Sequence, residues 1–188
     1  MPYTSTKPLL RSSSKDLYPW RPEGYEDLLV SRELWLTEEV KQKLDAWPFP
    51  SDLPEKTRSK ERKDINSFLT DFIVGRDMSI GIGQDFCDIK ALAASAGQPT
   101  EGWELRIIPG SCHTRIFGVF VTPQDFVATD AFRKQEMPGK GKNSQSNFAM
   151  MTPAKARALL KSPFISLKTK PRAAALGGEA YGYYNCGY

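Results

Sequence analysis

Arginine and lysine side chains are concentrated between residues 133 and 172, where ten basic residues accompany a single acid, Glu136. A guanidinium group can pair two N–H donors with two phosphate oxygens, and a lysine ammonium offsets phosphate charge. This stretch is therefore the electropositive part of the molecule. The whole chain has 26 basic and 22 acidic residues, and its net charge of +4 is compatible with a nucleic-acid partner.

Two of these lysines, Lys140 and Lys142, stand in the segment PGKGKN. Their charge, together with backbone amides that the glycines leave accessible, could bind the phosphates that flank a nucleic-acid site. The segment does not match the GxxxxGK[ST] phosphate loop, and Gly81-Ile82-Gly83 lacks the third glycine of a dinucleotide fingerprint. We therefore expect no nucleotide cofactor site of either kind.

His113 is the only histidine, and histidine is the one side-chain type whose ordinary pKa suits proton transfer near neutral pH. A histidine in a turn also serves structural roles or is simply exposed, so both alternatives stay open. The three cysteines, Cys87, Cys112 and Cys186, are widely spaced and form no CxxC pair. The sequence therefore indicates reduced thiols, with neither a zinc site nor a disulfide framework.

A first strand is expected within 25–36. Two helices are expected to follow it, before the main part of the sheet. Thr37, followed by Glu38 and Glu39, is a typical helix N-cap and first turn, and Pro48 ends this helix. The stretch 57–74 has apolar residues at i, i+3, i+4, i+7 and i+8, with Gly75 as its C′ residue, so it predicts an amphipathic helix. A further short helix is expected at 88–96.

Beyond residue 100 the apolar pattern changes to a period of two. The stretches 103–108, 115–121 and 125–132 alternate like paired strands and predict an antiparallel meander, most of whose aromatic side chains lie in the core. A basic loop over 133–147 follows. Thr152-Pro153 then predicts the start of a helix over 154–161. We expect an α+β domain in which two N-terminal helices pack on one face of a small, mainly antiparallel sheet.

Composition sets the limits of this domain. With 188 residues, 40% of them hydrophobic, the chain can build one core, which we expect over 23–161. A flexible arm is expected over 1–22 and a Gly/Tyr-rich tail over 162–188. No apolar run approaches the length of a membrane span, and the first residues lack a signal-peptide core, so we expect a soluble, cytoplasmic protein.

Three motifs occur in a characteristic order: GWELR at 102–106, RIF at 115–117 and AFRK at 131–134. Together with the order of strand, two helices and meander, they resemble the RelE/HigB/ParE toxin superfamily, most closely its HigB or phage gp49-like branch. The resemblance covers about residues 25–160, and its specific part is 100–136. It implies an mRNA interferase of a toxin–antitoxin pair, with RNA, the ribosome and a cognate antitoxin as partners and with no cofactor. We expect the sheet face away from the two helices, together with the basic loop, to stay open for RNA.

In that family a ribose 2′-hydroxyl attacks the adjacent phosphate without a metal. The resemblance implies that Arg115 holds the scissile phosphate and that Arg106 flanks it on the neighbouring strand. Arg133 and Lys134 match the basic end of the family's last strand, where phosphate contact or proton transfer is expected. His113 and Asp130 are the candidate proton-transfer groups. For Arg106 an ion pair with Glu104 is the structural alternative, and for Arg133 and Lys134 it is a solvated strand end.

The sequence also departs from the family pattern. Asp130-Ala131 stands where the family often has His-Gly, and Arg133-Lys134-Gln135 stands where it has Lys-Lys-Thr. Both terminal extensions are long for the family. A second hypothesis is therefore a non-catalytic module of the same fold, of phage or mobile-element origin, that binds nucleic acid or a protein. A third is an interaction protein that uses its Tyr-rich tail.

Overall fold

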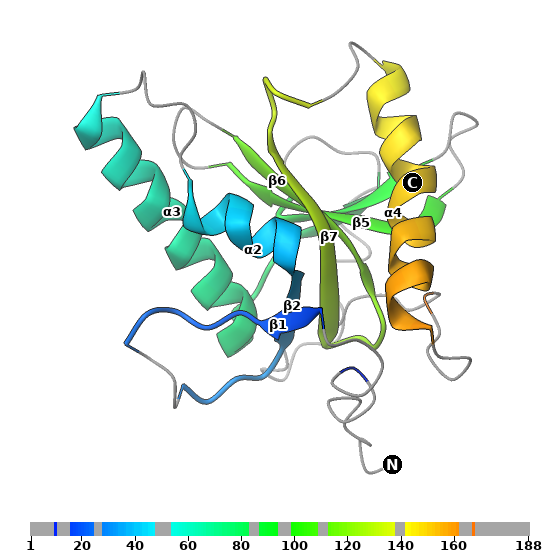
Figure 1. Cartoon of the computed structure of the whole chain (residues 1–188), viewed down its shortest axis with the longest axis horizontal. Coiled ribbons are helices and arrows are strands. Elements are labelled where there is room, and N and C mark those ends of the chain that lie inside the picture. The colour runs from blue at the N-terminus through cyan, green and yellow to red at the C-terminus, as the bar shows by residue number, and fades with distance from the viewer. Residues whose placement is uncertain are drawn as a thin grey trace.

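The computed structural model describes residues 10, 16–24, 28–47, 54–82, 87–93, 99–108, 113–137, 142–161 and 167. Within these residues a mixed seven-stranded sheet has the strand order β1-β2-β7-β6-β5-β4-β3 (Figure 1). The strands are β1 (Leu17–Pro19), β2 (Glu33–Thr37), β3 (Ile80–Ile82), β4 (Ile89–Ala93), β5 (Pro99–Ile107), β6 (Thr114–Phe120) and β7 (Asp125–Arg133). The helices are α2 (Glu38–Asp45), α3 (Glu55–Val74) and α4 (Lys142–Leu160).

The predicted antiparallel meander is confirmed as β5, β6 and β7, and β4 extends it on the far side of β5. Two pairings are parallel: β2 lies against β7, and β3 lies against β4. The ladder between β6 and β7 shifts register at Phe117 and Gly118. A Cβ on Gly118 would lie 2.2 Å from the backbone oxygen of Val127, so only glycine fits at this close approach.

One face of the sheet carries α3 and the larger core. The predicted amphipathic helix is confirmed, and Gly75 ends it in the left-handed conformation at φ 83°. Apolar side chains of α3 pack against those of β5, β6 and β7, with Phe72 against Phe120 and Phe126. The expected helix after Thr37 is also present as α2, and the Thr37 hydroxyl accepts a hydrogen bond from the Val40 backbone N–H at 3.2 Å.

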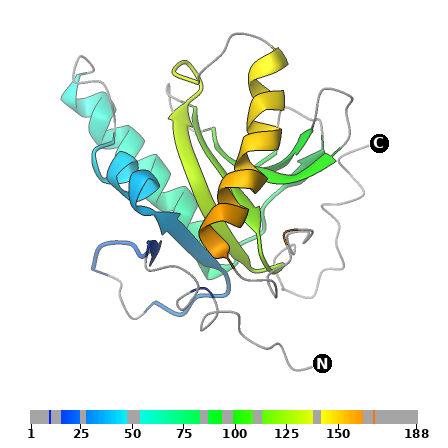
Figure 2. The ribbon, with the colours of Figure 1, turned by 45° about the vertical axis from the view of Figure 1, so that its right-hand side comes forward.

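The opposite face is covered by α4, as Figure 2 shows. The expectation that this face stays open for RNA was therefore wrong, as was the expectation of a small sheet carrying only two helices. The helix also begins at Lys142 rather than after Pro153, which lies inside it. Gly102 has no Cβ, and the Cβ position it leaves empty is 3.5 Å from the Pro153 ring, so α4 can approach β5 closely.

Two further expectations need correction. Residues 89–93 form strand β4 instead of a helix, because their backbone groups complete the open edge of β5. Leu17–Pro19, which the sequence assigned to the flexible arm, pairs with β2 as β1. Leu10 and Leu167 are buried in the same apolar cluster as Leu160 of α4, so the described parts of both extensions belong to the fold.

None of the described helices combines the length and the apolar character that crossing a bilayer requires.

Candidate functional site

Four charged side chains meet on the face of the sheet that α4 covers. In the strand register, Lys90 of β4 lies directly across from Glu104 of β5, and Arg106 of β5 lies across from Arg115 of β6. Glu104 also lies directly across from Phe117 of β6. Phe117 packs against Phe148 of α4, so these strand residues point to the face of the sheet that α4 covers. We call Lys90, Glu104, Arg106 and Arg115 the charged cluster.

All members of the charged cluster are buried. The exposed fraction is 1% for Glu104, 3% for Arg115, 4% for Arg106 and 8% for Lys90. Glu104 Oε1 lies 2.7 Å from Arg115 Nε and 3.5 Å from Arg106 Nε. Charges taken out of water are tolerated only when they are paired, so this carboxylate is the electrostatic centre of the group.

The environment of Glu104 perturbs its titration. Burial raises the pKa of its carboxyl above the ordinary value, and the positive charges of Arg106, Arg115, Lys90 and Lys134 act in the opposite direction. Its second oxygen, Oε2, accepts no hydrogen bond from the described residues. The carboxyl thus combines a raised pKa with an unused acceptor, which is the combination expected of a group that takes up a proton.

His113 and Lys134 lie beside the charged cluster. His113 immediately precedes β6, and its backbone oxygen accepts a hydrogen bond from the Lys134 N–H at 3.1 Å, just after β7 ends. Lys134 is exposed, and its charge acts on Glu104. His113 adopts a left-handed backbone conformation at φ 36°, which is uncommon for a residue other than glycine. The strand register therefore places Arg106 and Arg115 side by side, and the backbones of His113 and Lys134 meet at the adjoining strand ends.

Arg133 lies on the opposite face. Adjacent residues of a strand point to opposite faces, and Phe132, rather than Arg133, is the neighbour of Arg115 in the register. Arg133 Nη2 donates to Glu61 Oε2 of α3 at 2.9 Å, and both side chains are buried. Its guanidinium also lies over the ring of Trp47, 5.5 Å from the centroid. Arg133 thus ties β7 to α3 and does not join the charged cluster.

Asp130 is likewise held by two helices. Its carboxylate is paired with Lys43 of α2 at 3.0 Å and with Lys155 of α4. Asp130 lies across from Phe117, which in turn lies across from Glu104, so one strand separates the two acids on the same face. Lys142 is the first residue of α4, and Lys140 lies outside the described residues.

Aromatic rings adjoin the charged cluster. Phe117 and Phe148 stack at 4.3 Å between ring centroids with an interplanar angle of 8°, and Phe132 contacts both rings. The prediction that most strand aromatics lie in the core is confirmed: Trp103, Phe117, Phe120 and Phe126 are buried. Within the described part of the chain, no group of three or more His, Cys, Asp or Glu side chains is placed to hold a metal ion.

Sequence reasoning missed the central role of Glu104 and the presence of Lys90. Glu104 was considered only as an ion-pair partner of Arg106. The alternation in WELR could have placed it on the same strand face as Arg106. Lys90 carried no such signal, because its segment was assigned to a helix and a helix has no strand neighbours.

Comparisons of the chain with protein-family models, with curated proteins and with solved structures found no match. The function is therefore inferred from the geometry of the chain's own residues.

Proposed function

We propose that this chain is an endoribonuclease of the RelE/HigB type: a toxin that cleaves messenger RNA on the ribosome and is neutralised by a partner antitoxin. The observation that carries the proposal is the charged cluster, where three cations surround one carboxylate on adjacent strands. The order β2, α2, α3 and then the β5–β7 meander supports it further. An excess of positive charge at a fixed position is what cleavage of a phosphodiester requires.

In the proposed reaction, the ribose 2′-oxygen bonds to phosphorus while the bond from phosphorus to the next 5′-oxygen breaks, which leaves a 2′,3′-cyclic phosphate. Arg115 and Arg106 offset the charge that grows on the phosphate oxygens. Glu104 takes the proton of the 2′-hydroxyl, and its raised pKa suits that task. His113 donates a proton to the leaving 5′-oxygen.

The proposal requires that RNA reach a buried group. The exposed fraction of Arg115 is 3%, and α4 is the described helix that packs on this face. Substrate binding must therefore displace what covers the charged cluster and replace the Glu104–Arg115 pair with a phosphate–Arg115 pair. A lid that opens for substrate also excludes water from the reaction when it closes.

The test is induction of the wild type and of Arg115→Lys in a bacterial host, with growth recorded and transcript 5′ ends mapped within minutes. Arg115→Lys keeps the charge needed by Glu104 but loses the planar fork, so we expect cleavage to fall by about 100-fold or more while the protein stays folded. Arg76→Lys is the matched control, since Arg76 is exposed, follows the C-terminal end of α3 and pairs with Asp71 of that helix. Equal cleavage by wild type and Arg115→Lys would contradict this site.

A second candidate is a non-catalytic binding module of the same fold. It is favoured by the burial of Arg106, Arg115, Asp130 and Arg133, each at most 4% exposed and each near an oppositely charged side chain. Folded wild-type protein that neither arrests growth nor cuts RNA, but binds RNA or DNA with an affinity that falls as salt rises, would favour this candidate over the nuclease.

A further inference from the structure

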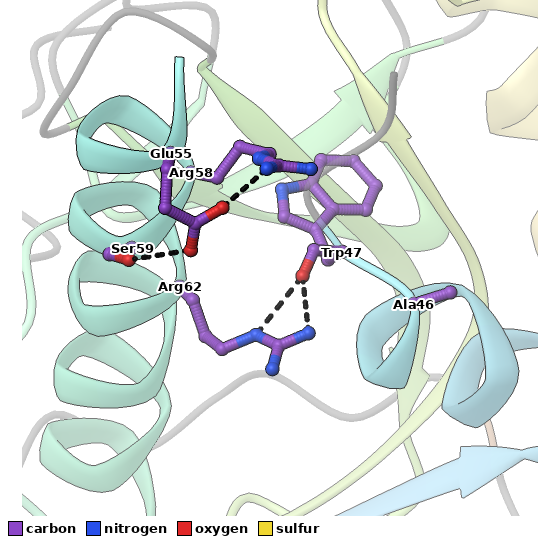
Figure 3. A pocket seen from close by; sticks show the side chains of 6 residues that line it. All are labelled: Ala46, Trp47, Glu55, Arg58, Ser59 and Arg62. Carbon is purple, nitrogen blue, oxygen red and sulfur yellow. Dashed lines mark hydrogen bonds and ion pairs between the residues drawn. The ribbon is translucent and has the colours of Figure 1, made fainter. Parts of the chain in front are cut away.

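A pocket of about 210 Å³ lies between the C-terminal end of α2 and the first turns of α3. It is lined by Ala46, Trp47, Glu55, Arg58, Ser59 and Arg62, and we call it the basic pocket (Figure 3). The Trp47 ring separates it from Arg133, which packs on the α3 face of the sheet. The basic pocket is therefore distinct from the charged cluster, which lies on the α4 face.

Two hydrogen-bond donors in the basic pocket have no acceptor among the described residues. Trp47 is 3% exposed, and its indole Nε1–H makes no hydrogen bond. Arg58 Nε is also buried without a hydrogen-bond partner. In Figure 3 the indole nitrogen lies on the side of the ring that faces Glu55 and Arg58. A buried donor without an acceptor costs free energy, so a ligand that supplies the acceptor is stabilised here.

Arg62 is held rigidly at the same pocket. Its Nε and Nη2 donate to the Trp47 carbonyl oxygen at 3.1 and 2.7 Å, and Nη2 also reaches the Asp45 carbonyl oxygen at 2.9 Å. These bonds place a fixed positive charge beside the cavity. Because two of its nitrogens already donate to backbone carbonyl oxygens at the C-terminal end of α2, the Arg62 side chain is ordered before an anion binds.

The start of α3 adds to the positive potential. This helix has 20 residues, its N-cap is Pro54, and no side chain caps its first N–H groups. The positive end of the helix dipole therefore lies next to Glu55 and Arg58. The one acid, Glu55, is exposed and pairs with Arg58, so its carboxylate occupies the position that an anionic ligand would take.

We propose that the basic pocket binds a phosphate group, whose oxygens accept hydrogen bonds from Trp47 Nε1 and Arg58 and lie beside the fixed charge of Arg62. A tetrahedral oxyanion fits donors that converge from several directions better than a planar carboxylate, which one guanidinium fork satisfies. The volume holds several water molecules and so admits a phosphate with the first atoms of its ester. On binding, Glu55 releases Arg58 and turns toward solvent.

The proposal is tested by calorimetric titration of the full chain with inorganic phosphate at low ionic strength. We expect Arg58→Gln to weaken binding about tenfold or more, and Trp47→Phe, which keeps the ring but loses the N–H, to weaken it severalfold. Glu55→Gln should tighten binding, because the competing negative charge is gone. Lys60→Gln is the matched control: it removes one positive charge from the exposed surface of the same helix and should leave the affinity unchanged.

Two outcomes would overturn the proposal. One is no binding by wild type at phosphate concentrations on the order of 10 mM, where even a weak site is occupied. The other is equal weakening by Arg58→Gln and Lys60→Gln, which would mean that phosphate responds only to net charge. Thermal unfolding midpoints matching wild type show that Arg58→Gln and Trp47→Phe are folded. If Arg58→Gln fails this check, Arg58→Lys replaces it; this variant keeps the charge but loses the guanidinium fork, so it should also weaken binding.

The same titration in the Arg115→Lys background separates this site from the proposed nuclease site, since the basic pocket should bind phosphate equally well there. A short single-stranded RNA without terminal phosphates then identifies the source of the group. RNA binding that Arg58→Gln weakens supports a backbone phosphate. Binding of inorganic phosphate and of a 5′-mononucleotide, without binding of this RNA, supports a terminal phosphate.

Discussion

At the scale of single residues, a prominent feature of this molecule is its buried ion pairs. Glu61 of α3 and Arg133 of β7 are 72 positions apart in the sequence and meet at 2.9 Å in the core. Glu61 stands four residues before Ile65, so helical spacing puts it on the apolar face of α3, but that spacing does not show which side chain would pair with it. A charge at such a position is buried only because a partner reaches it from another element.

This pair leads to a first prediction. Glu61→Gln should lower the free energy of unfolding by about 3 kcal/mol, because it leaves the Arg133 guanidinium buried beside a neutral group. The double variant Glu61→Leu with Arg133→Met should recover most of that loss, since both charges are gone. Chemical denaturation of Glu61→Leu, of Arg133→Met and of the double variant measures the coupling, and simple additivity of the two single losses would contradict a buried pair.

A second residue-scale prediction concerns pH and Glu104. A carboxyl whose pKa is raised in the folded state binds more protons there than in the unfolded chain. Its contribution to stability is therefore fully present below the ordinary glutamate pKa of about 4.3 and is lost as pH rises through the folded-state pKa. Denaturation at a series of pH values should show this decline in wild type but not in Glu104→Gln. Parallel profiles for the two proteins would mean that burial does not control this carboxyl.

At the scale of elements, local patterns predicted the meander and both early helices, because period-two alternation and i, i+3, i+4 spacing are properties of a single segment. The same patterns misled at 88–96, since a short apolar segment is ambiguous until its neighbours are known. They also missed the first part of α4, where lysine, serine and asparagine residues looked like a loop. Packing on the sheet overrides that weak preference.

Gly118 makes the close pairing of β6 and β7 testable. In Gly118→Ala the new Cβ would meet the Val127 backbone oxygen at 2.2 Å and the Phe126 ring at 2.5 Å, so the strands must separate. We expect a loss of stability of about 3 kcal/mol, the upper end of overpacking effects. Gly102→Ala is the control, since its nearest contact is the Leu92 Cδ1 methyl at 3.0 Å, which can move. Equal midpoints of thermal unfolding for the two variants would contradict this account.

At the scale of the whole molecule, the sheet is a layer between two different helical covers. The α3 side is a continuous apolar core, whereas the α4 side has two smaller apolar clusters together with the charged cluster. Asp130 joins α2 and α4 through Lys43 and Lys155. A cover held by smaller apolar contacts and an ion pair is the one expected to open at lower free energy.

Lys155→Met tests this attachment. Removing the Lys155–Asp130 pair should raise amide hydrogen exchange over 148–160 about tenfold and leave exchange in α3 unchanged, because α3 packs on the opposite face of the sheet. Arg157→Met is the control, since Arg157 is more exposed and its pair with Glu101 should contribute little. Exchange rates in α3 and α4 that rise together would show global destabilisation instead of local opening.

The sequence by itself determined the α+β class, the β5–β7 meander, the helices α2 and α3, and the strand positions that put Arg106 and Arg115 on neighbouring strands. Only the tertiary structure decided that β2 pairs in parallel with β7, that β4 extends the sheet, that α4 covers the face expected to be open, and that Arg133 lies away from Arg115. The physical reason is the distance along the chain between the residues that determine each feature. Alternation within a strand says which side chains share a face, but what packs over that face depends on segments far away in the chain.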